Sequence, residues 1–129
     1  MIEYINYASA PLPRGHYSQA VKANGFVFVA GQLPLVPGDE LIIPPGLDAQ
    51  VMQVFDNLKA VLHAADSSLR QLVSVQIFIA DIGNWPRVNE LYARILGNAP
   101  APARTVVPCP QIHYGAELEV NAIAVTAST

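Results

Sequence analysis

Two stretches of the chain carry apolar side chains at helical spacing. From Leu47 to Ala65 one stripe is apolar and the opposite side is polar, which predicts an amphipathic helix. A shorter helix is predicted between Asn84, a candidate N-cap, and Gly97, a residue that typically ends a helix. Both helices therefore have one face suited to packing on a common core.

The other apolar positions alternate with polar ones, which is typical of strands because successive side chains point to opposite faces. Asn24-Gly25 separates two such runs, at 17–22 and 26–30, and predicts a hairpin turn. The other expected strands are a short edge strand within 1–10, a short strand at 40–43 inside the proline-rich loop 33–46, and strands at 72–80, 105–107 and 117–125.

This order of elements predicts an α+β fold in which two helices cover one face of a mixed β-sheet, giving two layers. The length of 129 residues suits one domain, spanning residues 1–129. The composition adds that 52% of residues are hydrophobic and only 13% are charged. Because a small fold cannot hide so much apolar surface by itself, we expect a homo-oligomer.

Charge and cysteine content further restrict the class of protein to which the chain can belong. The net charge is −3 and the sequence has no cluster of Lys and Arg, so binding to nucleic acid is disfavoured. No apolar run reaches the length of a membrane span, and no secretory signal is expected at the start of the sequence. A single cysteine fits a reducing, cytoplasmic location.

The residues that are candidates for binding or catalysis lie near the end of the sequence. Arg104 follows two prolines that stiffen the backbone, and its planar guanidinium matches a carboxylate. The last strand then places Glu117, Glu119 and Asn121 on one face. Asn121 could orient a water or a substrate amine, and the two glutamates are conceivable bases. The structural alternative is that Arg104 pairs with Glu117 or Glu119, or is simply solvated.

Other nucleophile and metal sites are disfavoured. Cys109 stands between two prolines, and nothing in the sequence brings it to His16, His63 or His113. The three histidines are dispersed without metal-ligand spacing, and there is no glycine-rich phosphate loop. From the residues alone the sequence predicts a small α+β enzyme or ligand-binding domain with an anion site.

Six segments make the sequence resemble a known family. They are PRGHYSQAV at 13–21, FVFVAGQLPLVPG at 26–38, QVFDNLKAVLHAAD at 53–66, VSVQIFIADIGNWPRVNELY at 73–92, PARTVV at 102–107 and ELEVNAIAV at 117–125. Together they resemble the RidA (YjgF) family of reactive intermediate imine deaminases. The resemblance implies a chorismate-mutase-like fold, a homotrimer with sites between subunits, and no metal or organic cofactor.

The resemblance also implies an activity and its residues. The family hydrolyses 2-imino acids and their enamine tautomers to 2-keto acids and ammonia. The arginine of its PAR motif, here Arg104, holds the substrate carboxylate, and Tyr17 lines the same pocket. The backbone at Gly31 and Val106 is expected there too, with Asn89 as a weaker candidate.

Four positions depart from the family pattern. A glutamate usually stands directly before the Ala-Ile-Ala of the last strand and positions or activates water, but here that place is Asn121. Asn121 is therefore the expected water-orienting residue, beside Arg104 and Tyr17. Ala30 replaces a usual serine, Val106 a frequent cysteine, and His16 a usual proline.

Two alternatives to a general imine deaminase follow. A trimer could bind small 2-keto or amino acids without turnover, because the usual glutamate is replaced. A pathway-specific deaminase could act on a larger enamine, because Ala30 and Val106 give a drier and differently shaped pocket.

Overall fold

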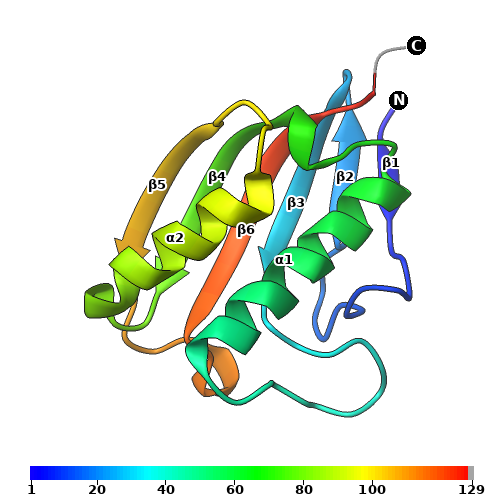
Figure 1. Cartoon of the computed structure of the whole chain (residues 1–129). Coiled ribbons are helices and arrows are strands. Elements are labelled where there is room, and N and C mark those ends of the chain that lie inside the picture. Colours follow the sequence, from blue (N-terminus) through cyan, green and yellow to red (C-terminus); the bar gives the residue numbers. More distant parts are fainter. Residues whose placement is uncertain (128–129) are drawn as a thin grey trace.

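The computed structural model describes residues 1–127 and has two layers. Two helices lie side by side on one face of a single six-stranded sheet (Figure 1). The strand order is β1-β2-β3-β6-β4-β5, and all neighbouring strands are antiparallel except β4 and β5. The predicted α+β architecture, a mixed sheet covered on one face, is confirmed.

The strands are β1 (Glu3–Ile5), β2 (Ala20–Ala23), β3 (Phe26–Gln32), β4 (Leu72–Ile79), β5 (Ala103–Pro108) and β6 (Leu118–Val125). The helices are α1 (Leu47–Ala64) and α2 (Trp85–Leu96), and three 3-10 turns, η1 (Leu69–Gln71), η2 (Ile82–Asn84) and η3 (His113–Gly115), complete the elements. Helix α2 makes the crossover that the parallel pair β4–β5 requires.

The hairpin between β2 and β3 forms where it was predicted. Asn24 and Gly25 have φ angles of 52° and 80°, and two successive positive angles characterise the turn that matches strand twist. Strand β2 nevertheless begins at Ala20, not at residue 17. The reason is that the backbone N–H of Gln19 donates to the side-chain oxygen of Asn6, so it is used outside a strand ladder.

One further local prediction is confirmed in position, and another is wrong. Asn84 is the N-cap residue of α2, but its side chain makes no capping hydrogen bond and its amide donates to the Glu117 carboxylate at 3.3 Å. Residues 40–43 form no strand, although the backbone N–H of Val36 donates to the carbonyl of Ile42. The loop 33–46 is therefore folded back on itself without joining the sheet.

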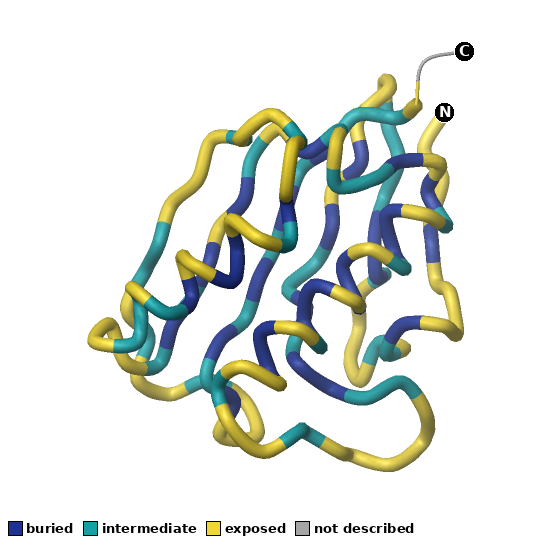
Figure 2. The backbone as a smooth tube through the Cα atoms, in the orientation of Figure 1, coloured by how far each residue is buried: buried dark blue, intermediate teal, exposed yellow. Residues whose placement is uncertain are grey.

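The two faces of the sheet differ in burial, and buried and exposed positions alternate along the strands in Figure 2. The face under the helices forms the core with the apolar stripe of α1. The other face, which we call the open face, carries Phe26, Phe28 and Val73, whose exposed fractions are 42%, 45% and 44%. Large apolar side chains on one uncovered face are typical of a surface that another chain covers.

Among residues 1–127, no helix combines the length and the apolar character needed to cross a membrane.

Candidate functional site

Arg104 lies near the start of the edge strand β5, beside helix α2. Its guanidinium donates a hydrogen bond of 2.9 Å to the side-chain oxygen of Asn89. The guanidinium carbon also lies 4.6 Å from the ring centre of Trp85 and 5.2 Å from that of Tyr92. Cation–π contacts of this kind hold a guanidinium in place without neutralising its charge. Arg104 is therefore oriented by α2 and still able to bind an anion.

The helix supplies these three partners because of its period. Trp85, Asn89 and Tyr92 are separated by four and three residues, so they lie along one side of α2. Tyr92 is buried, and its ring meets that of Phe55 edge-on at 5.7 Å, which anchors this side of α2 on α1. Burial raises the pKa of the Tyr92 hydroxyl, and nearby Arg104 lowers it by less. The hydroxyl therefore stays protonated beneath the guanidinium.

Glu119 forms a second candidate cluster, on the other side of the sheet. It lies on β6, and its carboxylate packs directly against Gly31 of β3, where any Cβ would overlap an oxygen of Glu119. A Cβ at this position would require the flexible Glu119 carboxylate to shift, so glycine permits the close contact. Burial raises the pKa of the Glu119 carboxyl, and His113 lowers it by less. A half-buried carboxyl with a raised pKa is suited to accept a proton.

Tyr17 belongs to the same region as Gly31. The exposed Tyr17 lies in the loop that precedes β2, and it lines a small pocket together with Gly31, Gln32 and Tyr114. The structure thus brings together Tyr17 and Gly31 of the expected site. A neighbouring shallow groove, which shares Tyr17 with this pocket, contains His16.

Buried polar side chains fix the segments around this pocket. Gln19 is 1% exposed, accepts from the Tyr7 backbone N–H at 2.6 Å and donates to the Pro11 carbonyl at 2.7 Å. From α1, Asn57 donates to the carbonyls of Leu33 and Leu35 just after β3. Because each bond satisfies a group shielded from water, these loops are held rigidly.

Arg104 and Glu119 do not meet within one chain. In the sheet register β4 residue Val75 pairs with Arg104, whereas β4 residue Phe78 pairs with Glu119. Val75 is fully buried under the helices, and Phe78, three residues later, points to the open face. The two charged side chains therefore belong to opposite faces of the sheet, and one small molecule cannot touch both in a single chain.

The remaining expected site residues lie in different surroundings. Asn121 is half-buried on the open face, opposite Gln76 of β4. It lies two residues beyond Glu119, about 6.6–6.8 Å along the strand, and so does not share the contact with Gly31. Val106 is partly buried against the core, on the edge strand that carries Arg104. Edge strands leave backbone amide groups unpaired on one side, where a ligand or another chain can use them.

The structural alternative for Arg104, an ion pair with a glutamate of the last strand, is wrong. The guanidinium pairs with neither Glu117 nor Glu119 but with Asn89. Glu117 is engaged elsewhere, since its carboxylate accepts from Asn84 and its backbone N–H donates to Gln50. The Cys109 thiol makes a weak contact of 3.7 Å to the carbonyl of Gln111, while its backbone N–H donates to the carbonyl of Ile79 at 2.8 Å. Within residues 1–127, no three of the usual metal-binding side chains gather into a metal site.

Sequence reasoning missed two features that the structure supplies. The aromatic support of Arg104 was encoded by the spacing of Trp85, Asn89 and Tyr92 on one predicted helix face. The contact between Glu119 and Gly31 depends on the pairing of β3 with β6, where Gln32 lies opposite Val120. Only a correct strand register could have revealed that contact.

Comparisons with known proteins agree on one family. Residues 7–126 match the family model described as endoribonuclease L-PSP. The RutC family protein PH0854 of Pyrococcus horikoshii is 38% identical over 96% of this chain and 98% of its own length. The crystal structure of yeast YEO7 superposes with a TM-score of 0.92 at 35% identity, covering 98% of this chain and all of that one. The structure of Escherichia coli TdcF with bound serine has a TM-score of 0.91 at 29% identity and covers 97% and 99% of the two chains.

Proposed function

The chain belongs to the YjgF/RidA family, whose model is described as endoribonuclease L-PSP, and from this premise we propose that it hydrolyses reactive 2-imino acids and their enamine tautomers to 2-keto acids and ammonia. The observation that supports the proposal is that the Arg104 guanidinium is held in place but keeps its charge free for an anion. Its guanidinium is held by Asn89 and two aromatic rings, and no carboxylate of the described residues neutralises it. Such a guanidinium is suited to the carboxylate of a small acid.

The proposed reaction adds one water to the C=N bond. Arg104 binds the substrate carboxylate and so presents the adjacent imine carbon. Glu119 accepts a proton from the attacking water as its oxygen bonds to that carbon. The same proton is then delivered to nitrogen, which gives a carbinolamine. Glu119 next accepts the hydroxyl proton and passes it to the same nitrogen, and the C–N bond breaks as the carbonyl forms, releasing ammonia. Glu119 is deprotonated again at the end, so atoms and charges balance.

Glu119 takes the water-activating role in this proposal in preference to Asn121. A carboxylate can accept the proton, whereas an amide cannot do so at neutral pH. The raised pKa of Glu119 and its contact with Gly31 support this choice. Asn121 remains a candidate for orienting the water from the same face, and Tyr17 closes the pocket from the side.

A site containing both Arg104 and Glu119 needs two copies of the chain. We therefore propose a homotrimer in which Arg104 of one subunit faces Glu119, Gly31 and Tyr17 of the next. The apolar side chains on the open face, Phe26 and Phe28 among them, support burial against other subunits. A cytoplasmic location fits the single Cys109.

The test is the rate of keto-acid release from imines that an amino-acid oxidase generates in situ. Wild-type protein should accelerate hydrolysis above the spontaneous rate, and Arg104→Ala should lower kcat/KM by about 100-fold, since two charge-assisted hydrogen bonds are lost. Arg70→Ala is the matched control, because Arg70 is an exposed arginine of η1 that does not line the pocket of Tyr17 and Gly31. Full activity of Arg104→Ala would contradict the proposal.

A second candidate function is binding without turnover. It is favoured by one observation, that the related Escherichia coli protein TdcF was crystallised with bound serine. In that case calorimetry would detect binding of 2-ketobutyrate, while imine hydrolysis would stay at the spontaneous rate. Ribonuclease activity is less well supported, because 7 Lys and Arg face 10 Asp and Glu.

A further inference from the structure

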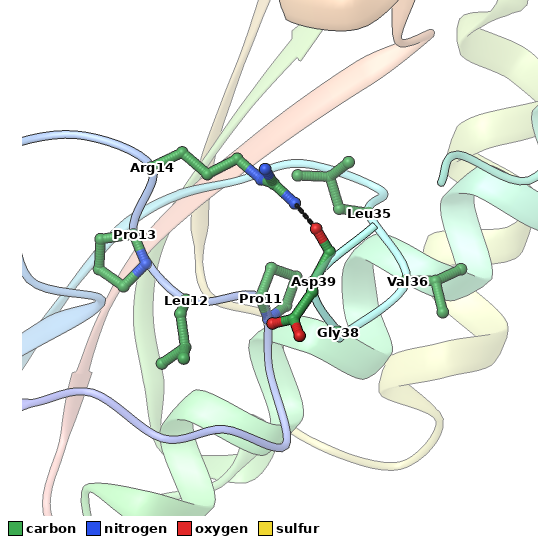
Figure 3. Close-up of a pocket in the computed structure, with 8 residues that line it drawn as sticks. All are labelled: Pro11, Leu12, Pro13, Arg14, Leu35, Val36, Gly38 and Asp39. Atoms are coloured by element: carbon green, nitrogen blue, oxygen red, sulfur yellow. Dashed lines mark hydrogen bonds between the residues drawn. The ribbon is translucent and has the colours of Figure 1, made fainter. Parts of the chain in front are cut away.

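Arg14 is a second arginine beside the candidate site. It lies in the loop between β1 and β2, three residues before Tyr17, and its side chain is exposed. The guanidinium reaches across a pocket and donates to the backbone carbonyl of Asp39 at 3.4 Å (Figure 3). The Asp39 carboxylate points away from it in the same view. Among the described residues, Arg14 takes part in none of the ion pairs.

Two neighbouring pockets share Arg14 as part of their wall. The inner pocket contains Tyr17 and Gly31, and the outer pocket of Figure 3 extends to Val36 and Asp39. Four residues line both pockets: Pro11, Leu12, Arg14 and Leu35. Arg14 therefore stands where a molecule that begins beside Gly31 would continue outward.

We propose that Arg14 binds a second anionic group of the substrate, so that the preferred substrates are 2-imino dicarboxylic acids. This inference rests on the proposed function, in which Arg104 of a neighbouring subunit binds the first carboxylate. The apolar walls of Pro11, Leu12 and Leu35 suit the methylene groups between the two carboxylates.

Charge explains why a second arginine matters. The chain has a net charge of −3, and Glu119 adds a carboxylate beside Gly31. These negative charges repel a substrate with two carboxylates unless each carboxylate binds a cationic side chain. A planar guanidinium offers two parallel N–H donors to a carboxylate, whereas its present bond to Asp39 is near the upper distance limit. A carboxylate is therefore the better partner.

The walls that carry Arg14 are preorganised. Pro11 and Pro13 restrict the backbone before it, and the buried Gln19 donates to the carbonyl of Pro11 at 2.7 Å. On the opposite wall, Asn57 donates to the carbonyl of Leu35 at 2.8 Å. Rigid walls lower the entropy cost of binding, so the distance between Arg14 and Gly31 can select for substrate length.

The test compares a monocarboxylic imine with dicarboxylic ones. An oxidase generates 2-iminobutyrate, 2-iminosuccinate or 2-iminoglutarate from the matching amino acid, and kcat/KM is measured for wild type and Arg14→Met, in which methionine keeps the apolar stem. Arg14→Met should lower kcat/KM for a dicarboxylic imine about tenfold and change the value for 2-iminobutyrate less than about twofold. Arg70→Met should change neither. Equal losses for both substrate classes, or no loss, would overturn the inference.

A binding measurement separates this inference from the proposed function. Calorimetry with 2-oxoglutarate and 2-oxobutyrate needs no turnover. Tighter binding of 2-oxoglutarate that disappears in Arg14→Met supports the dicarboxylate site even if no imine is hydrolysed. If wild type hydrolyses imines but binds both keto acids equally, and Arg14→Met changes neither affinity, the proposed function stands and the dicarboxylate inference fails.

Discussion

Arg104 and Glu119 lie on opposite faces of one sheet, although only β4 separates their strands β5 and β6. The register of β4 fixes this relationship, because Val75 beside Arg104 points into the core and Phe78 beside Glu119 points to the open face. A reaction that needs both an anion-binding guanidinium and a base therefore requires a second subunit.

Two inactive variants should restore activity when they are combined in one oligomer. Arg104→Ala and Glu119→Gln should each disable every site of the proposed homotrimer. In co-expressed mixed trimers, a site is intact wherever a subunit with Arg104 faces a subunit with Glu119, which is about a quarter of the sites at equal amounts. Activity of the mixture is measured against each variant alone. If no mixture exceeds the separate variants, the two residues do not act across a subunit boundary.

A charge on the open face should dissociate the oligomer. Phe28 is 45% exposed in the single chain and contacts Phe26, with ring centres 6.3 Å apart. Phe28→Glu would bury a carboxylate at the subunit contact, so the mass from light scattering should fall from about three chains to one. Met52→Glu is the control, because Met52 is equally exposed on α1, away from the open face. Dissociation by both variants, or by neither, would contradict this interface.

The ring of Trp85 should set the affinity for the substrate carboxylate. Replacing it with alanine removes the closer of the two rings over Arg104, and we expect KM to rise about tenfold, because cation–π contacts contribute up to about 2 kcal/mol where water is excluded. Trp85→Phe keeps a ring and should recover most of the affinity. A change in kcat alone, with KM unchanged, would show that Trp85 does not orient Arg104.

Trp85 also gives a direct binding signal. It is the sole tryptophan of the chain, so its fluorescence should change when a keto acid binds next to Arg104. Arg104→Ala is the control, in which the same ligand should leave the emission unchanged.

The sequence was sufficient for those parts of the fold that depend on local pattern. The stripe of α1, the end of α2 at Gly97 and the Asn24-Gly25 turn were all predicted, because spacing and backbone preference determine them. The predicted start of β2 was wrong because a distant side chain, Asn6, decides where its ladder begins.

The site was predicted less completely than the fold. Arg104 stood out because of its prolines, and Tyr17 and Gly31 share a pocket as the family resemblance implied. The environment of Glu119 depends on the β3–β6 register, which residue spacing within β6 does not encode. The alternation of side chains along β6 places both Glu119 and Asn121 on the same face, so it does not distinguish between them. Only the neighbouring strand distinguishes the glutamate that packs on Gly31 from the amide two residues later.

Glu119 should make the stability of the fold depend on pH. Burial raises the pKa of Glu119 above its usual value of about 4.3, so the folded chain binds this proton more readily than the unfolded chain does. The stabilising contribution of the protonated form is fully present below the unfolded pKa and is lost as pH rises through the folded pKa. In the single folded chain, where Arg104 lies on the other face of the sheet, the ionised carboxylate therefore destabilises the fold at neutral pH.

Glu119→Gln removes that charge and should melt at a higher temperature than wild type at pH 7, with the difference shrinking as pH falls toward 4. Glu40→Gln, at an exposed loop position, should melt within about 1 °C of wild type throughout. Thermal unfolding of the three proteins between pH 4 and 8 measures this. In the same window wild-type kcat/KM should fall as pH decreases through the raised pKa, because protonated Glu119 cannot accept a proton from water. A stability difference without this acid limb would mean that Glu119 is buried for packing and that another group activates the water.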